Sequence, residues 1–386
     1  MRFDFATSID RRQYAAKKWL RYADDVLPLW IADMDFVSPP AVVEALEARV
    51  AHGVFGYDAT PDSLRHTLCA WSAQHYDWPI EPDWQVWLPG VVPALHLACL
   101  ALTEPGDGVL TLTPIYPPFL KVAERSGRLA QEAPLAEPAA GEPWRLTCEA
   151  LEAAITPQTR LLLWCHPHNP TGRVWDRAEL ALLAELAERH DLTIVSDELH
   201  CDLILNDEPH RPLAALYPDL AARIITLWAP SKTFNIAGLG CACAVISDAT
   251  LRRRWQTTMS GLMPEVNLLG LLAAEVAYRD GEPWRQALLE VLRGNRQRIA
   301  DHLAGWPNVA CRLPEATYLA WLDLRGAGLG DNPQQYLLEQ ARVALSDGAD
   351  FGWPGFARLN FGTTPERLEA ALQRLDGVLG KAGGHG

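Results

Sequence analysis

The chain lacks the cysteine spacings that mark a disulfide framework or a structural zinc site. It holds eight cysteines among 386 residues but no CxxC pair, and most lie inside apolar runs, as do Cys99, Cys165, Cys241 and Cys243. Cysteines in such runs are typical of small core residues in a reducing compartment. His166 belongs to a Cys-His-Pro-His run whose spacing does not match a zinc finger. We therefore predict a cytoplasmic protein without a metal site.

Positive charge and long apolar stretches are also scarce. Lysine and arginine number 34 against 48 acidic residues, which gives a formal net charge of −14, and they form no basic cluster. Nucleic-acid binding depends on such a cluster, so this class of function is excluded. The chain has no apolar stretch of membrane-spanning length and no signal-peptide pattern at its start. We predict no nucleic-acid partner and no membrane association.

What is present is the composition of a globular enzyme, with 49% hydrophobic and 21% charged residues. A chain of 386 residues exceeds one compact core, so we expect a large domain and a smaller one. Between residues 90 and 246, short apolar runs alternate with helical patterns such as residues 177–190. Strands are predicted at Gly108 to Leu112, Leu161 to Cys165, Thr193 to Val195, Ile224 to Trp228 and Cys241 to Ile246. The alternation predicts an α/β fold with a mostly parallel central sheet covered by helices.

Three of the predicted strands are closely followed by side chains of different chemistry. Asn169 lies in Asn-Pro-Thr-Gly, Asp197 in Ser-Asp-Glu-Leu-His, and Lys232 in Ala-Pro-Ser-Lys-Thr-Phe-Asn-Ile-Ala-Gly. Open α/β sheets bind ligands beyond the carboxyl ends of their strands, so an amide, a carboxylate and an amine are expected at one site. A lysine there can bond covalently to a carbonyl group. Each residue also has a purely structural alternative to a place in the site. Asn169 could form a turn, Asp197 could cap the next turn, and Lys232 could be a solvated surface lysine.

Together these motifs resemble those of the fold-type I enzymes that depend on pyridoxal phosphate (PLP). In detail, the chain is similar to the cystathionine β-lyase-like, or C–S lyase, branch of the class I/II aminotransferase family. This branch resemblance is carried by Leu-Trp-Ile-Ala-Asp-Met-Asp-Phe at residues 29–36 and by Thr-Pro-Ile-Tyr-Pro-Pro-Phe at residues 113–119. It is carried also by His200, where many aminotransferases have tyrosine. The resemblance implies PLP as the cofactor and the α/β, fold-type I architecture of PLP-dependent transferases.

The resemblance also implies a role for each strand-end residue. Lys232 would bond to PLP and remove the substrate's Cα proton, and Asp197 would face the ring nitrogen. Asn169 would donate to the 3-oxygen of the cofactor, and His200 would complete this part of the cofactor site. Tyr116 would stack on the cofactor ring and act with Lys232 and Asp197 as a catalytic residue. Its structural alternative is a packed aromatic in a proline-rich loop.

The phosphate group is expected at a helix N-terminus. Gly90 precedes an apolar helix, so the amides of Val91 and Val92 and the helix dipole would face the anion. Ser231 is expected to add a hydroxyl. A glycine before a helix is also a frequent structural junction. Family transaminases usually carry an arginine eight residues after the lysine, where this chain has Gly240, so one charged contact to the phosphate is missing.

Two further residues match the family pattern. Arg358, in the strand-like segment 356–361, matches the arginine that grips the substrate α-carboxylate, with Asn169 beside it. Tyr57 matches a tyrosine that reaches the phosphate of the neighbouring subunit, which implies a homodimer with shared active sites. From the residues alone, Arg358 could be an exposed strand residue and Tyr57 a packed aromatic.

The resemblance implies a large PLP-binding domain of residues 46–284 and a small domain of residues 1–45 and 285–386. The implied activity is β-elimination from S-substituted L-cysteines such as cystathionine, which yields a thiol, pyruvate and ammonia. Two alternatives stay open, an aminotransferase that shares the cofactor and a regulatory protein that retains PLP. Motifs of this kind define a cofactor better than a reaction. Gly240 argues against an ordinary aminotransferase.

Overall fold

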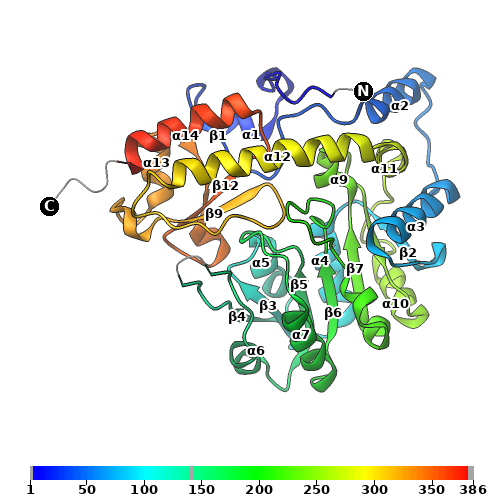
Figure 1. Cartoon of the computed structure of the whole chain (residues 1–386). Coiled ribbons are helices and arrows are strands. Elements are labelled where there is room, and N and C mark those ends of the chain that lie inside the picture. The colour runs from blue at the N-terminus through cyan, green and yellow to red at the C-terminus, as the bar shows by residue number, and fades with distance from the viewer. Residues whose placement is uncertain (1–2, 140–141, 381–386) are drawn as a thin grey trace.

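A seven-stranded sheet, in the order β2-β8-β7-β6-β5-β3-β4, forms the centre of the molecule (Figure 1). The structure is a computed structural model that describes residues 3–139 and 142–380. Strands β3 to β7 run parallel, whereas β8 runs antiparallel to both of its neighbours. The predicted α/β fold with a mostly parallel sheet is confirmed.

The strands of this sheet are β2 (Gln85–Leu88), β3 (Gly108–Thr113), β4 (Leu129–Pro134), β5 (Thr159–Cys165), β6 (Thr193–Asp197), β7 (Ile224–Trp228) and β8 (Ala242–Val245). A three-stranded antiparallel sheet has the order β11 (Ser346–Asp347), β12 (Phe356–Asn360) and β9 (Leu319–Asp323). A short parallel pair joins β1 (Leu27–Pro28) to β10 (Val343–Ala344). Each strand predicted between residues 90 and 246 is present, with ends that differ by at most two residues.

The helices are α1 (Lys17–Leu20), α2 (Pro40–His52), α3 (Asp62–Tyr76), α4 (Val91–Leu102), α5 (Pro117–Arg125), α6 (Cys148–Ala154), α7 (Arg177–Arg189), α8 (Leu213–Leu216), α9 (Pro230–Thr233), α10 (Ala249–Met259), α11 (Leu268–Asp280), α12 (Glu282–Leu303), α13 (Pro333–Gln340) and α14 (Pro365–Leu379). Helix α7 begins where the pattern predicted, because Asp176 and Glu179 form a capping box at its first turn. Helix α12 crosses the molecule above the sheet and packs against α14 (Figure 1).

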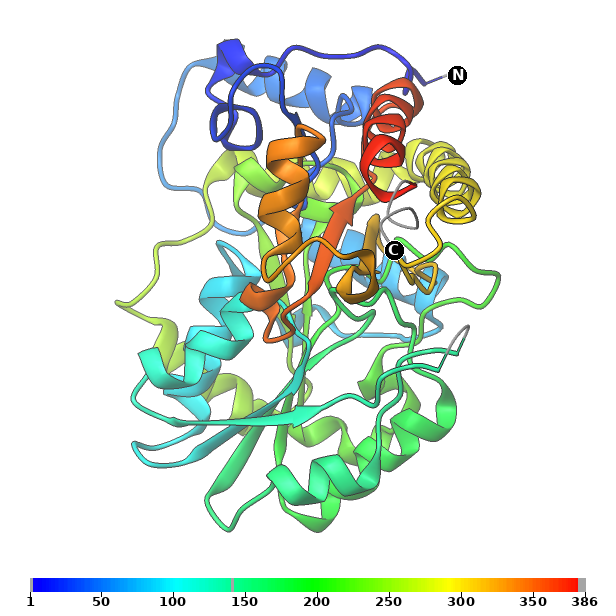
Figure 2. The same ribbon diagram turned by 90° about the vertical axis from the view of Figure 1, so that its left-hand side faces the viewer.

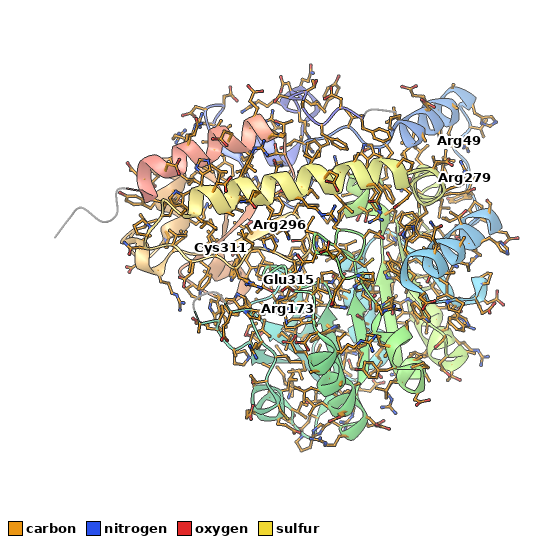
Figure 3. The ribbon with its side chains drawn as sticks, viewed as in Figure 1. Arg49, Arg173, Arg279, Arg296, Cys311 and Glu315 are labelled. Carbon is orange, nitrogen blue, oxygen red and sulfur yellow. The ribbon has the colours of Figure 1, made fainter. Side chains whose placement is uncertain are left out.

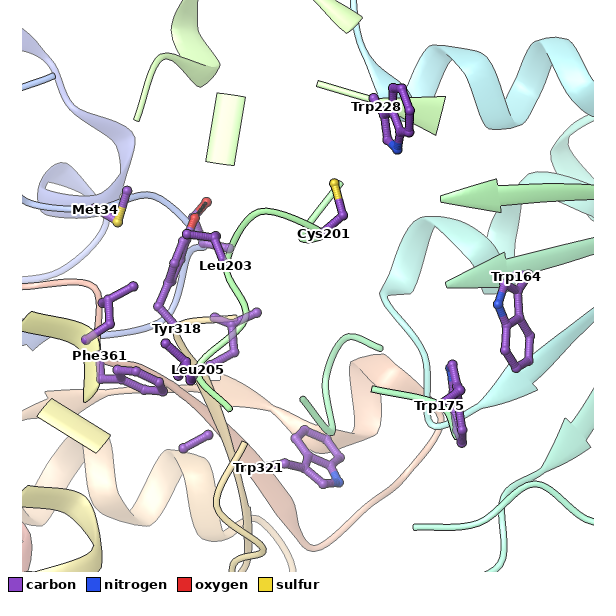
Figure 4. Close-up of a cluster of buried hydrophobic side chains, with 14 of the residues drawn as sticks. Met34, Trp164, Trp175, Cys201, Leu203, Leu205, Trp228, Tyr318, Trp321 and Phe361 are labelled. Atoms are coloured by element: carbon purple, nitrogen blue, oxygen red, sulfur yellow. Dashed lines mark hydrogen bonds between the residues drawn. The ribbon is translucent and has the colours of Figure 1, made fainter. Parts of the chain in front are cut away.

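Side chains of the central strands point alternately into two hydrophobic cores. In β5, Leu161 and Leu163 pack in the core that α4, α5 and α10 cover, whereas Leu162 and Trp164 pack in the other, to which α3, α7 and α11 contribute. Trp164 and Trp175 lie together in this second core, with ring centroids 5.2 Å apart (Figure 4). Because both faces are buried, the strands appear in the sequence as continuous apolar runs.

The N-terminal segment before α2 and the C-terminal segment that contains β10 to β12 come together above the central sheet (Figure 2). Besides the pairing of β1 with β10, Asn360 Nδ2 donates to the carbonyls of Ile31 (2.6 Å) and Asp33 (2.7 Å). The domain boundaries expected after residues 45 and 284 fall inside α2 and α12. The division into two domains stays a prediction, and residues 1–2 and 381–386 of the expected small domain lie outside the described residues.

A polar contact anchors the segment before β9 to the loop after β5. Arg173 donates to Glu315 Oε2 (2.8 Å) and to Glu179 Oε2 (2.6 Å), and Figure 3 shows Arg173 beside Glu315. Gly172 has a φ of +69°, and a Cβ on it would lie 2.3 Å from the Cβ of Pro314. The glycine of the Asn-Pro-Thr-Gly motif is therefore needed both for its backbone conformation and for this close approach.

The structure also bears on the composition arguments. Cys99, Cys165, Cys241 and Cys243 are free and buried, as expected for core residues. In the part of the chain that the structure describes, no helix is both long and apolar enough to cross a membrane. Among those residues, too, no group of three or more His, Cys, Asp or Glu side chains could hold a metal ion.

Candidate active site

A cavity of about 730 Å³ lies at the carboxyl ends of β5, β6 and β7. This volume is within the range of small-molecule sites, roughly 300–1,000 Å³. Asn169, Asp197 and Lys232 all line it, so the structure brings the three strand-end residues together. The cavity is also lined by Val91, Val92, Tyr116, His200, Ser231 and Arg358. Of the predicted site residues, Tyr57 alone lies apart, fully exposed between α2 and α3.

Lys232 lies in α9, the short helix that begins directly after β7. Its Nζ donates a hydrogen bond of 2.5 Å to the carbonyl of Ala32. Burial lowers the pKa of Lys232 to about 8, although the Asp33 and Asp197 carboxylates act to raise it. A lysine with this pKa has a substantial neutral fraction near neutral pH. Lys232 is therefore suited to act as a nucleophile or a base.

Asp197 is the last residue of β6, and its side chain is buried. Burial raises its pKa to about 7, although a hydrogen bond from the Leu199 amide to Oδ1 (3.1 Å) acts to lower it. Asp197 thus caps the following turn, which is the structural role that the sequence left open for it. It also lines the cavity, so it has both roles. A cation placed beside this carboxylate would stabilise its charged form.

His200 is buried three residues beyond β6 and lines the same cavity. Burial, with the positive charges of Lys232 and Arg358, lowers the pKa of His200 to about 3. Its Nδ1 has no hydrogen-bond partner among the described residues. His200 is therefore a neutral ring with a free polar atom in a buried place, which suits a ligand contact.

Arg358, on β12, connects three parts of the cavity wall. Its Nη1 donates to Asn169 Oδ1 (2.9 Å), and its Nη2 donates to the Trp30 carbonyl (3.0 Å) and to Ser346 Oγ (3.4 Å). The guanidinium carbon lies 4.8 Å from the ring centroid of Phe351. Burial lowers the pKa of Arg358 to about 10, so the group stays cationic at neutral pH.

The charge of Arg358 has no carboxylate partner within residues 3–139 and 142–380, and its buried Nε has no hydrogen-bond partner there. A buried guanidinium of this kind is stabilised when it binds an anion. Because the guanidinium can grip a carboxylate through two parallel hydrogen bonds, the site suits an amino-acid carboxylate.

The N-terminus of α4 opens into the same cavity. Gly90 precedes this 12-residue helix, and no side chain of the described residues caps it. Val91 and Val92, in the first turn of α4, line the cavity, as does Ser231 of α9, so the free amides and the hydroxyl could bind a phosphate group. Gly240 also lines the cavity, with a φ of +57° that favours glycine. At this position, where family transaminases have arginine, the backbone thus has a conformation that any residue with a Cβ would adopt only with strain.

Tyr116 immediately precedes α5 and is half-buried in the cavity wall. Burial is the main reason that its pKa is raised. The position beside Asn169, Asp197 and Arg358 in one cavity is compatible with stacking on a flat ligand.

Several residues near Lys232 were not predicted from the sequence. The Ala32 carbonyl accepts hydrogen bonds from Lys232 Nζ and from the hydroxyl of Tyr318 (3.1 Å), which Figure 4 shows among buried side chains. Asp33 lines the cavity and pairs with Arg11 (2.7 Å). The motif at residues 29–36 was a usable signal for Ala32 and Asp33. Tyr318 lies in an ordinary hydrophobic strand pattern, which contains no such signal.

A buried carboxylate behind the cavity anchors α9. Asp202 Oδ2 accepts from Thr233 Oγ1 (2.9 Å), next to Lys232 in the chain. Its Oδ1 accepts from Trp71 Nε1 (3.1 Å) and from the hydroxyl of Tyr76. Because a buried polar group is held firmly when all its partners are present, this network fixes the backbone from which Lys232 projects.

The solved structures define the class of fold. Cystalysin from Treponema denticola, whose crystal structure contains a pyridoxal 5'-phosphate cofactor, superposes with a TM-score of 0.93 at 32% identity over 98% of this chain and 99% of that chain. The crystal structure of OvoB gives a TM-score of 0.94 at 42% identity, again over 98% and 99%. The fold is therefore the α/β, fold-type I architecture that the resemblance implied.

The family follows from the sequence comparison. Residues 24–375 match the family described as aminotransferase class I and II, and the chain belongs to this family. It is 38% identical to cystathionine beta-lyase PatB of Bacillus subtilis (strain 168) over 362 residues, which are 92% of this chain and 93% of that protein. The resemblance to the cystathionine β-lyase-like branch is confirmed.

Proposed function

We propose that this chain is a PLP-dependent carbon–sulfur β-lyase that acts on S-substituted L-cysteines such as cystathionine. The observation that carries the proposal is one cavity that combines a lysine of lowered pKa, a buried aspartate and an unpaired buried arginine, Lys232, Asp197 and Arg358. The similarity to cystathionine beta-lyase PatB and to the PLP-containing cystalysin supports it.

The residues present fit PLP group by group. Lys232 would bond to the carbonyl carbon, the Asp197 carboxylate would accept a hydrogen bond from the protonated ring nitrogen, and the amide of Asn169 would face the 3-oxygen. The remaining contacts would come from Tyr116 and His200 around the ring and from Val91, Val92 and Ser231 at the phosphate. When bound, PLP supplies an electron sink for the pair of electrons left at Cα.

Arg358 would hold the substrate α-carboxylate through two hydrogen bonds and so orient the Cα–H bond toward Lys232. The substrate amine would displace Lys232 from its bond to PLP, and the freed neutral amine of Lys232 would then take the Cα proton, which a protonated lysine cannot do. Asp197 would stay ionised beside the protonated ring nitrogen of bound PLP, because the two opposite charges would stabilise each other. The Cβ–S bond then breaks, sulfur leaves as a thiolate and is protonated to a thiol. The released aminoacrylate reacts with one water to give pyruvate and ammonia.

The test is to incubate the protein and PLP with L-cystathionine and to measure thiol, pyruvate and ammonia together. A parallel reaction contains a keto-acid acceptor. Formation of all three products without acceptor supports β-elimination. The family description keeps an aminotransferase as the second candidate. Amino transfer that requires the acceptor, with no free thiol, would establish that candidate instead.

The role of Lys232 is tested by Lys232→Ala, which should abolish turnover and leave some non-covalent binding of PLP. Lys121→Ala, on the exposed surface of α5, is the matched control and should keep full activity. Substantial lyase activity in purified Lys232→Ala would contradict the assigned role.

The working unit in this proposal is a homodimer, in which Tyr57 of each subunit reaches the phosphate site of the other. Its support is a run of exposed apolar residues, Val54, Phe55 and Tyr57, between α2 and α3. Sedimentation should give a dimer, and Tyr57→Ala should weaken retention of PLP. A monomer with full activity would refute this part. The division into residues 46–284 and the remaining small domain, and the cytoplasmic location, belong to the same proposal.

A further inference from the structure

We propose that Tyr318 is a positioning residue for Lys232 and acts through the backbone carbonyl of Ala32, which both side chains share. Through this carbonyl, Tyr318 sets the direction in which the amine faces the substrate and the ease with which it releases a proton. The inference rests on one part of the proposed function, the removal of the Cα proton by Lys232, which a β-lyase and an aminotransferase have in common.

The hydrogen bond from Lys232 Nζ to the Ala32 carbonyl (2.5 Å) restricts how the amine can work as a base. A neutral amine has two hydrogens and a single lone pair in a tetrahedral arrangement. Because one hydrogen points at the Ala32 oxygen, the direction of this carbonyl limits the directions open to the lone pair. A base must direct its lone pair at the proton that it removes, so the orientation of one peptide group bears directly on the reaction.

The hydroxyl of Tyr318 is the second donor to the Ala32 carbonyl, at 3.1 Å. Residues 29–36 belong to no helix or strand, so no regular hydrogen-bond ladder orients this peptide group. A carbonyl oxygen has two lone pairs and can accept from both donors at once. The direction of the carbonyl is therefore set between two side chains, and Lys232 shares its hydrogen-bond acceptor with Tyr318.

Packing holds the Tyr318 ring in one place. The residue directly precedes β9 and is buried, and Figure 4 shows its ring among other buried side chains. Its carbonyl accepts from the Phe361 amide (2.8 Å), and a Cβ on Gly362 would lie 3.1 Å from its Cδ2 atom. The ring also meets His200, a lining residue of the cavity, edge to face with centroids 6.1 Å apart. Because a ring packed in this way has no room to move, its hydroxyl is a fixed point for the Ala32 carbonyl.

Other side chains hold the segment of residues 29–36, so the Tyr318 hydroxyl is not needed to anchor it. Asn360 Nδ2 donates to the carbonyls of Ile31 (2.6 Å) and Asp33 (2.7 Å), one on each side of Ala32. The structural alternative is that the hydroxyl only completes the hydrogen bonds of a buried tyrosine. Against this alternative, the hydroxyl is directed to the same carbonyl that the catalytic amine uses.

Sharing one acceptor also couples Tyr318 to the proton of Lys232. Both donors draw on the electrons of one carbonyl oxygen, so removal of the hydroxyl strengthens the remaining hydrogen bond. An ammonium donates a stronger hydrogen bond than a neutral amine and gains more from this change. Loss of the hydroxyl should therefore favour the protonated form of Lys232. The other charged or titratable groups around the amine stay the same, namely Asp33, Asp197, Arg358 and His200.

The first experiment follows proton removal in the PLP-loaded protein. Exchange of the Cα proton of L-alanine with deuterium is measured, because L-alanine has no sulfur to expel and so reports this step alone. Tyr318→Phe should lower the exchange rate at saturation about tenfold, while the concentration for half-saturation stays the same because Arg358 is unchanged. Tyr278→Phe is the control, since it removes the hydroxyl of a buried tyrosine in the same hydrophobic core that is not a lining residue of the cavity. An unchanged rate in Tyr318→Phe, or an equal loss in both variants, would overturn the inference.

The second experiment involves no turnover and follows covalent capture of PLP by the cofactor-free protein as the pH is changed. Tyr318→Phe should move the midpoint of capture upward by about half a pH unit. A protein with 3-fluorotyrosine at position 318 keeps the hydroxyl, but fluorine makes this hydroxyl a stronger donor, so the midpoint should move downward. Shifts of opposite sign are expected only if the hydroxyl acts on Lys232 through the shared carbonyl.

A midpoint that moves in neither protein, or in the same direction in both, would overturn the inference. If Tyr318→Phe does not fold, the fluorinated protein decides alone, because a downward shift supports the inference and an unchanged midpoint refutes it. These measurements also separate the inference from the proposed function. If the unchanged protein cleaves no S-substituted cysteine, the β-lyase proposal fails, but proton exchange and PLP capture still decide the role of Tyr318.

Discussion

The pH at which Lys232 loses its proton can be measured through its reaction with PLP. Only a neutral amine adds to a carbonyl carbon, so covalent capture of PLP by the cofactor-free protein follows the neutral fraction of Lys232. Burial lowers the pKa of this lysine to about 8. Because the neutral form prevails above the pKa, the capture rate should rise with pH and level off above about 8.

The size of the effect follows from this pKa. At pH 7, a pKa of about 8 leaves about one amine in ten neutral, whereas the ordinary lysine value of 10.5 leaves about one in three thousand. The protein environment therefore raises the reactive fraction roughly 300-fold, which corresponds to about 3 kcal/mol. The assay mixes cofactor-free protein with PLP at a series of pH values and follows the visible absorbance of the lysine-bound cofactor. A midpoint near 10 would refute the argument from burial.

The effect of Asp33 on the pKa of Lys232 can be tested with the same assay of PLP capture. The Asp33 carboxylate raises the pKa of Lys232, so Asp33→Asn should move the midpoint to lower pH. Arg11 and Lys18, which lie 2.7 Å and 3.5 Å from Asp33, remain positive and act in the same direction. Asp24→Asn is the control, because this exposed carboxylate lies on the same segment. An unchanged or higher midpoint in Asp33→Asn would show that the electrostatic argument is wrong.

Three further outcomes are expected. Asp197→Ala should slow exchange of the substrate α-proton with deuterium by about 100-fold, a size typical for the loss of one preorganised electrostatic partner, and undiminished exchange would contradict its role. Arg358→Lys should raise KM by about tenfold or more, because an ammonium cannot make the paired hydrogen bonds of a guanidinium, which steady-state kinetics checks. Asp35→Ala should lower the free energy of unfolding by about 3–5 kcal/mol, since Lys18 Nζ would stay buried after losing its close partner Asp35 Oδ2 (2.9 Å), with only the more distant Asp33 carboxylate (3.5 Å) left. Burial acts to raise the pKa of Asp35, but Lys18 and its other partners outweigh burial and lower it to about 2. The stability that Asp35 contributes is thus complete above its ordinary value of 3.8 and is lost as the pH falls through about 2, which denaturant unfolding in acid can measure.

The sequence by itself determined the central sheet and three of its functional residues. Strands β3, β5, β6 and β7 are buried on both faces, so each appears as an apolar run that needs no tertiary information to be recognised, whereas the edge strand β4 is mostly exposed and was not predicted. Asn169, Asp197 and Lys232 follow such runs closely, and the carboxyl ends of neighbouring parallel strands lie at one edge. Their meeting is therefore a consequence of local pattern and sheet topology.

The tertiary structure decided the properties that depend on segments far apart in the chain. The lowered pKa of Lys232 arises from burial and from charges on other elements, and its hydrogen bond to Ala32 spans 200 positions. Arg358 contacts Asn169 across 189 positions. Contacts of this range form only when the N-terminal and C-terminal segments pack above the sheet, so no local pattern contains them. The pKa values of the site are properties of that packing.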